Sequence, residues 1–239
     1  MDPMMLPYFC GPEKLPAPLP TISAIEAATE TLPSIHPPEY RHTVVVDQYF
    51  VVKYGTRMTE NEGYALLHLE KHTDISAPRL YAMYREKEKL YLVMDRKPRR
   101  QLSELWPSLR DDEKSSISGQ LHTIWDKIRS IPSPSTSFSN VTGGPPRHRW
   151  FQWLEPDSRI EGPFEKEDLN MALALRSWKN WGGNGRIGWM SEFFVRNLSR
   201  TLKNHRACLR TGIYSARIYW SGNFQRPAMG PGSYKSLLY

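Results

Sequence analysis

The stretch that decides the fold is residues 43–95, TVVVDQYFVVKYGTRMTENEGYALLHLEKHTDISAPRLYAMYREKEKLYLVMD. Within it, residues 43–46 and 49–53 are rich in the β-branched and aromatic side chains that strands prefer. Residues 79–84 and 90–94 have the same character, and the charged run REKEK between them predicts a turn. The stretch therefore predicts two pairs of neighbouring strands.

A helix is predicted between the two strand pairs, over Thr59–His72. Leu66 and Leu69 belong to an apolar stripe on this helix, and Thr59 with Glu62 matches a capping box. Strand, strand, helix, strand, strand is the order of elements in the small lobe of a protein kinase. We therefore expect an α+β fold of the protein-kinase-like type, with an antiparallel β small lobe followed by an incomplete helical lobe.

Residues 1–40 form a proline-rich segment that holds nine of the 20 prolines. Proline removes a backbone donor and fixes φ, so this segment is predicted to be neither a continuous helix nor a central strand. Residues 21–31 are the exception, because their alanine and glutamate side chains favour a short helix. We expect the rest of the segment to lie on the surface as an arm.

After Met94 the pattern turns helical. Apolar residues that recur every three or four positions predict a helix with one buried face: Ile117, Leu121, Ile124 and Ile128. Residues 130–146 are rich in Ser, Pro and Gly and predict a loop. Two further helices are predicted at 165–181 and 189–205, with GGNGRIG between them as a connector.

The chain is expected to divide into four parts: a proline-rich arm with a short helix at 1–40, a kinase-like small lobe at 41–95, a partial helical large lobe at 96–206, and a non-native, poorly ordered tail at 207–239. The tail contains no Asp or Glu and four of the 32 basic side chains. The other residues carry 28 basic and 25 acidic side chains, so the net charge of +7 falls to +3 without the tail. The sequence pI of about 9.4 is therefore a poor indicator of a nucleic-acid partner.

Cysteine usage and hydropathy indicate the compartment. Cys10 and Cys208 lie far apart, which disfavours a disulfide scaffold and fits a reducing environment. The start MDPMMLPYFC has no basic region followed by an apolar run, so no signal peptide is predicted. No run reaches the roughly 18 apolar residues that a membrane helix needs. We expect a cytoplasmic protein with no membrane partner.

Lys53 stands at the end of a predicted strand, and Glu62 stands near the start of the next helix. A phosphotransferase needs a cation on such a strand to hold the phosphates of ATP, and an acid on the helix to fix that cation. The plainer alternative is a lysine in water and a glutamate that only caps its helix. These two residues alone leave both interpretations open.

The segments around them follow one another as in a known family. VVKYG, APRLYAMY, LYLVMD, LSELW, IRSIP, VTGGP and EGPF occur in this order. Over roughly residues 21–206 the chain resembles the fungal aminoglycoside phosphotransferases, which share the protein-kinase fold. The resemblance implies ATP and Mg²⁺ as cofactors, phosphorylation of a small hydroxylated substrate, and a nucleotide site that includes Lys53 and Glu62.

The same resemblance implies a hinge whose backbone meets adenine, formed by Val93, Met94 and Asp95. Taken alone, Met94 is more often a core residue at a strand end. One feature of the covered part departs from the family pattern. Kinases cover the nucleotide with a glycine-rich turn, and the segment HPPEYRHTVVVDQYF before VVKYG contains no glycine.

A larger departure lies at Cys208–Trp220, CLRTGIYSARIYW. One permitted set of codons for this run, read from the third base of the Cys208 codon, gives FTHGDLQRKNIL. That string resembles the catalytic loop of the family, in which the HGD aspartate orients the attacking hydroxyl and the later asparagine binds metal. We therefore expect the reading frame to leave that of the family near Ala207. The chain as printed then has no catalytic residue and no Mg²⁺ site, and we expect it to be inactive.

Other interpretations stay open. A pseudokinase or partner-binding module would keep the small lobe without turnover. PPRHRW with Trp150 and Trp153 fits a single-stranded nucleic-acid site, although a solvated loop anchored by tryptophans is simpler. His68 and His72 have the spacing of two metal ligands on a helix, and two surface histidines are the simpler interpretation. GGNGRIG lacks the Lys-Ser/Thr ending of a P-loop.

Overall fold

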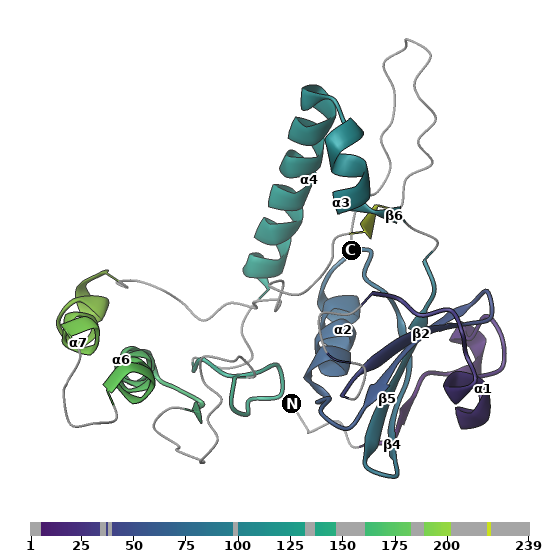
Figure 1. The fold of residues 1–239 in the computed structure, drawn as a ribbon, viewed down its shortest axis with the longest axis horizontal. Coiled ribbons are helices and arrows are strands. Elements are labelled where there is room, and N and C mark those ends of the chain that lie inside the picture. The colour runs from purple at the N-terminus through teal and green to yellow at the C-terminus, as the bar shows by residue number, and fades with distance from the viewer. Residues whose placement is uncertain are drawn as a thin grey trace. The chain divides into compact units, whose positions relative to one another are not determined.

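The computed structural model describes residues 6–33, 37, 40–97, 100–131, 137–146, 161–182, 189–201 and 219–220 (Figure 1). The described chain is α+β, as the sequence predicts: a five-stranded antiparallel sheet comes first and helices follow. It forms two compact units: the first lies within residues 2–129 together with 210–239, and the second lies within residues 130–209.

The sheet belongs to the first unit and has the strand order β1-β4-β5-β3-β2, with antiparallel neighbours throughout the described strands. The bounds are β1 Tyr8–Phe9, β2 His42–Val46, β3 Phe50–Gly55, β4 Leu80–Glu86 and β5 Lys89–Asp95. The four predicted strands are confirmed to within two residues at each end. The REKEK turn is confirmed too: Lys87 and Glu88 have φ angles of 46° and 64°, the positive values that a two-residue hairpin turn requires.

The helices of the first unit are α1 Ile22–Glu26, α2 Asn61–His72, α3 Leu102–Leu105 and α4 Asp111–Ser130, with 3₁₀ turns η1 Pro12–Lys14 and η2 Trp106–Ser108. The second unit holds α6 Lys166–Gly182 and α7 Trp189–Thr201. α4 buries Ile117 and Ile128, which confirms the helix predicted from that repeat. α6 and α7 confirm the two later helices, and the part predicted beyond residue 201 lies outside the described residues.

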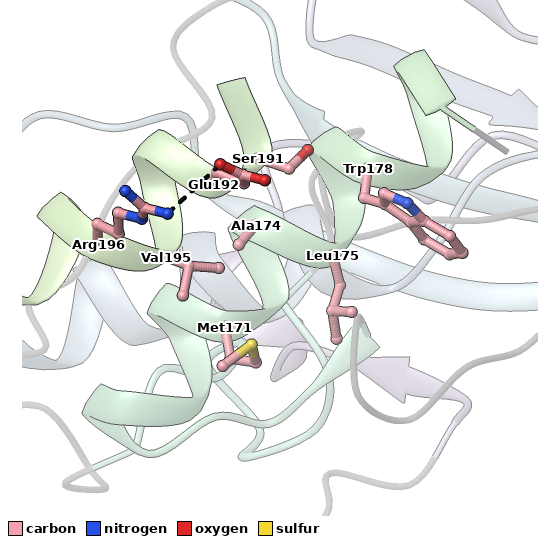
Figure 2. Close-up of a pocket in the computed structure, with 8 residues that line it drawn as sticks. All are labelled: Met171, Ala174, Leu175, Trp178, Ser191, Glu192, Val195 and Arg196. Carbon is pink, nitrogen blue, oxygen red and sulfur yellow. Dashed lines mark ion pairs between the residues drawn. The ribbon is translucent and has the colours of Figure 1, made fainter. Parts of the chain in front are cut away.

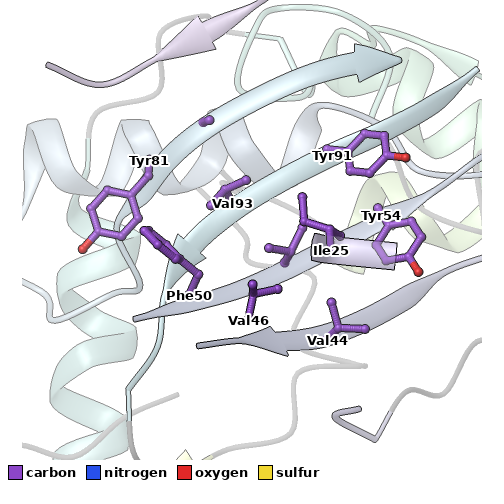
Figure 3. Packing of buried hydrophobic residues seen from close by; sticks show 10 residues of the cluster. Ile25, Val44, Val46, Phe50, Tyr54, Tyr81, Tyr91 and Val93 are labelled. Atoms are coloured by element: carbon purple, nitrogen blue, oxygen red, sulfur yellow. The ribbon is translucent and has the colours of Figure 1, made fainter. Parts of the chain in front are cut away.

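α1 covers one face of the sheet (Figures 1 and 3). Thr21 is its N-cap, because its hydroxyl accepts the Ala24 N–H at 3.2 Å. Ile25 is fully buried, and Figure 3 shows its side chain above the strands, near Val44 and Tyr91. This buried side chain is the main apolar contribution of α1 to the core of this face.

The proline-rich segment contributes more to the fold than the expected surface arm. β1 is an edge strand that pairs with β4, with Tyr8 opposite Met83. Leu15 and Leu19 also pack against the core beneath α1. The prolines exclude a central strand, but the apolar side chains between them are still able to pack against the core.

α2 covers the opposite face of the sheet (Figure 1). The buried cluster on this side is apolar and consists of Met58, Leu80, Met83, Leu90, Leu92 and Met94, with Tyr64, Leu66 and Leu67 of α2 packed against it. Residues alternate between the two faces along a strand. On β3 the side chains of Phe50 and Val52 lie in the α1-side core, so Lys53 lies on the α2 side.

Stacked rings cross the whole sheet on the α1 side, one from each strand: Phe9, Tyr84, Tyr91, Tyr54 and His42 in the order β1-β4-β5-β3-β2. The four centroid separations are 5.9, 5.3, 5.4 and 4.8 Å. Cross-strand aromatic pairs stabilise a particular strand register. This ladder therefore helps to fix the register that places Lys53 opposite Leu92.

Among the described residues, no helix is long and apolar enough to cross a bilayer. The poorly ordered tail expected at 207–239 lies outside the described residues, with the exception of Tyr219–Trp220. These two residues form β7, which pairs with β6 at Arg100–Gln101. The connector GGNGRIG, after Gly182, and the loop with Trp150 and Trp153 also lie outside the described residues.

Candidate functional site

Lys53 and Glu62 meet on the α2 face of the sheet. The Lys53 ammonium donates to the Glu62 carboxylate and forms an ion pair with it. The side chains are 28% and 33% exposed, so the pair is open to solvent on one side. The structure thus brings the two predicted nucleotide-site residues together, with one charge on the sheet and the other on the covering helix.

The approach of α2 to the sheet depends on Gly63. A Cβ atom at this position would lie 2.5 Å from the sulfur of Met83 and 3.3 Å from a methyl carbon of Leu80. Both residues belong to β4, so the missing side chain at Gly63 lets the first turn of α2 lie this close without displacing Met83. The neighbouring residue, Glu62, is thereby held within reach of Lys53.

The predicted capping box of Thr59 and Glu62 is wrong. α2 begins at Asn61, its N-cap residue is Glu60, and Glu60 makes no side-chain capping bond. The Glu60 carboxylate instead accepts two bonds from Arg85 of β4, at 2.6 and 2.9 Å. The capping box does not form because the two glutamates near the helix start, Glu60 and Glu62, instead form ion pairs with Arg85 and Lys53 of the sheet.

The predicted hinge residues lie at the end of β5, the strand between β3 and β4. Val93 and Met94 are buried, on the α1 side and the α2 side respectively. The Asp95 N–H donates to the Arg79 carbonyl at 3.0 Å, and the Arg96 N–H donates to the Tyr49 carbonyl at 2.7 Å. These two backbone donors are therefore used within the fold.

The Asp95 carboxylate ties the end of β5 to the residue before β4. It accepts the Arg79 N–H at 2.8 Å and forms an ion pair with Lys97 at 2.5 Å. Its side chain is 10% exposed. The Asp95 side chain thus links the end of β5 to the start of the neighbouring strand β4.

Two described parts of the segment before β2 lie close to the sheet. The Leu32 N–H donates to the Thr43 carbonyl of β2 at 2.8 Å. At Tyr40, a Cβ atom on Gly55 of β3 would lie only 2.0 Å from the Tyr40 carbonyl oxygen. Gly55 therefore supplies the close backbone approach beside Lys53, although the preceding segment has no glycine of its own.

His68 and His72 lie side by side on α2, with ring centroids 4.5 Å apart. The interpretation of both as surface histidines is wrong for His68, which is 6% exposed. Burial, then the charges of His72 and Lys71, lower the pKa of His68. Among the described residues, no third His, Cys, Asp or Glu joins this pair in a group that could hold a metal. The helical spacing of the two histidines predicts that they lie side by side, but it does not predict that His68 is buried.

A separate cavity of about 550 Å³ lies between α6 and α7 in the second unit (Figure 2). Its walls are mostly apolar and include Met171, Trp178 and Val195. The Ser191 hydroxyl is buried there without a partner among the described residues, and Glu192 pairs with Arg196 at 3.6 Å. The local sequence pattern gives no sign of this cavity, because the cavity requires the packing of two helices.

No protein-family model matches this chain, and no curated protein is similar enough to count as a match.

Proposed function

We propose that the first unit is a nucleotide-binding lobe of the protein-kinase-like type, in a chain related to the fungal aminoglycoside phosphotransferases. The observation that carries the proposal is the ion pair of Lys53 and Glu62. Kinases hold the phosphates of ATP with a lysine on a sheet strand, and an acid on the neighbouring helix fixes that lysine. The order β2, β3, α2, β4, β5 supports the same assignment.

Lys53 would hold the α and β phosphates of ATP, and Glu62 would position its ammonium group. Val93, Met94 and Asp95 would border adenine. Since the N–H groups of Asp95 and Arg96 bond within the fold, adenine has to use other backbone groups near this strand end. Val93 and Met94 are also paired with both neighbouring strands, so we place the proposed hydrogen bonds to adenine at the Asp95 carbonyl and at residues after Arg96.

We further propose that this chain binds ATP without transferring its phosphoryl group. Transfer needs a carboxylate to orient the attacking hydroxyl and further Asp or Asn side chains for Mg²⁺. The HGD string that supplies the first in the family does not occur in the sequence, and residues 207–239 contain no carboxylate side chain. A small hydroxylated substrate remains the proposed ligand class of the family. Nucleic acid is not proposed as a partner, because the tail carries four of the seven net positive charges.

Calorimetric titration of the full chain with ATP tests the proposal. We expect saturable binding with one nucleotide per chain and no release of ADP when Mg²⁺ is added. Absence of binding at millimolar ATP would contradict the proposal that the first unit binds nucleotide. Steady turnover in the presence of Mg²⁺ would instead contradict the proposed lack of catalysis.

A further inference from the structure

His68 is a buried imidazole with no hydrogen-bond partner in the described part of the chain. Neither ring nitrogen meets a donor or acceptor among the residues that the structure describes, and the side chain lies within the packed part of α2. A charged imidazolium in this position would lose its hydration and gain no bond in return. Burial therefore disfavours the charged form of His68 while α2 lies on the sheet.

The acidic side chains on and beside α2 already have cationic partners. They pair as Glu60 with Arg85, Glu62 with Lys53, Glu70 with Arg79, and Asp74 with Lys127. The charged groups that act on His68 are His72 and Lys71 of its own helix, and both oppose a positive charge. The sheet beneath α2 presents the apolar side chains of Met83, Leu80 and their neighbours. Protonation of His68 would thus gain no compensating charge from any described element packed around it.

We propose that α2 is a proton-sensitive latch on the site, in which protonation of His68 moves the helix off the sheet and separates Glu62 from Lys53. Both residues belong to one helix of 12 residues, so a displacement at His68 is transmitted along the helix to Glu62. A regulatory role for this movement rests on the proposed nucleotide site, whereas the movement itself does not.

The pH range follows from the direction of the pKa shift. His68 has a lowered pKa in the folded chain and about 6.5 when α2 is released, so the released form binds more protons between these values. Docking of α2 is therefore fully retained above about pH 6.5 and weakens as the pH falls toward the lowered pKa. One proton taken up per release event changes the docking equilibrium by up to about tenfold per pH unit.

Hydrogen exchange of the ligand-free full chain at about pH 7.5 and pH 5.5 tests the latch, after correction for the intrinsic pH dependence of exchange. We expect α2 amides to exchange up to about tenfold faster at the lower pH, and amides of β5 to change little. His68→Leu and His68→Met, two variants that cannot take up the proton, should abolish this acceleration. His122→Gln is the matched control, because the His122 side chain is 78% exposed on α4. This substitution should leave the acceleration of α2 exchange unchanged.

Equal acceleration in the His68 variants, or equal acceleration in α2 and β5, would overturn the latch. So would unchanged exchange of α2 in the unsubstituted chain. If one His68 variant does not fold, the other gives the same comparison. Because no nucleotide is present, a His68-dependent acceleration in a chain that fails to bind ATP would keep the latch and reject the proposed function.

Discussion

The Lys53 ammonium on β3 contacts the Glu62 carboxylate on α2, and this contact joins a central strand of the sheet to the helix that covers one of its faces. A second lysine and glutamate are joined in the same way on the other face. There Lys89 of β5 bonds to Glu26 of α1 at 2.7 Å. The two pairs have the same chemistry, but only the first lies at the proposed nucleotide site.

Gly63→Ala should weaken the docking of α2. The added methyl group would overlap the Met83 sulfur, at an overpacking cost of about 1–3 kcal/mol. The higher helix propensity of alanine offsets up to about 1 kcal/mol of this cost, so we expect a net loss of about 1 kcal/mol. Urea unfolding followed by circular dichroism measures the loss. The proposed site should respond as well, with weaker ATP binding in the variant.

Gly119→Ala is the control for that substitution. Gly119 lies within α4, and a Cβ atom there meets nothing within 4 Å. Alanine has the higher helix propensity, so this variant should be more stable by up to about 1 kcal/mol. A stabilising effect of Gly63→Ala would contradict the close approach of α2 to β4.

Ile25→Ala should destabilise the first unit by about 2–5 kcal/mol, the usual cost of deleting a fully buried isoleucine. Ile22→Ala in the same short helix should cost clearly less, since Ile22 is only half-buried. The midpoints of urea unfolding give the comparison. Equal effects of the two substitutions would show that α1 does not pack through Ile25.

The Tyr91 hydroxyl should ionise only at high pH, and the free energy of unfolding should therefore fall above about pH 10. Burial, followed by the nearby Glu26 carboxylate, raises the pKa of Tyr91 to about 12. Because the folded value exceeds the ordinary value of about 10, the stabilisation is complete below pH 10 and is lost as the pH rises toward 12. An ultraviolet titration of the chain minus that of Tyr91→Phe should show one phenol ionising near pH 12. A difference curve centred near pH 10 would contradict the burial of this hydroxyl beside Glu26.

The transcript tests the proposed change of frame near Ala207. If the hypothesis is right, the codons of Cys208–Trp220 are compatible with FTHGDLQRKNIL in the shifted frame. The measurement is nucleotide sequencing across codons 200 to 225. Codons that cannot encode the HGD string in that frame would contradict this hypothesis and leave the fold unaffected.

Local sequence pattern predicted the strands and the longer helices well. β-branched and aromatic runs identified β2 to β5, and the spacing of Ile117 and Ile128 identified α4. The pairing of Lys53 and Glu62 could also be predicted from the sequence. A lysine on a strand and an acid in the helix that follows it are brought together when the helix covers the sheet. These features depend on residues close together in the chain or on a recurring order of elements.

Features that depend on distant contacts were missed. β1 joins the sheet next to a strand more than 70 residues later, with Tyr8 opposite Met83, and its proline-rich surroundings indicated a surface segment. Ile25 is buried only because α1 crosses the aromatic side of that sheet. His68 matched a surface histidine by residue type, but in the folded chain it is buried.

The most direct test of the central claim compares ATP-induced thermal stabilisation of the chain with that of Lys53→Ala and Lys89→Ala. Each substitution removes one lysine–glutamate pair between strand and helix, so losses of stability from the ion pairs themselves should be similar and small. Bound ATP should raise the melting temperature by about 2–4 °C for each kcal/mol that it adds to the free energy of unfolding, an amount set by the ratio of ATP concentration to its Kd. We predict that this rise survives in Lys89→Ala and disappears in Lys53→Ala; an equal rise in both variants, or none in the unsubstituted chain, would contradict the nucleotide site.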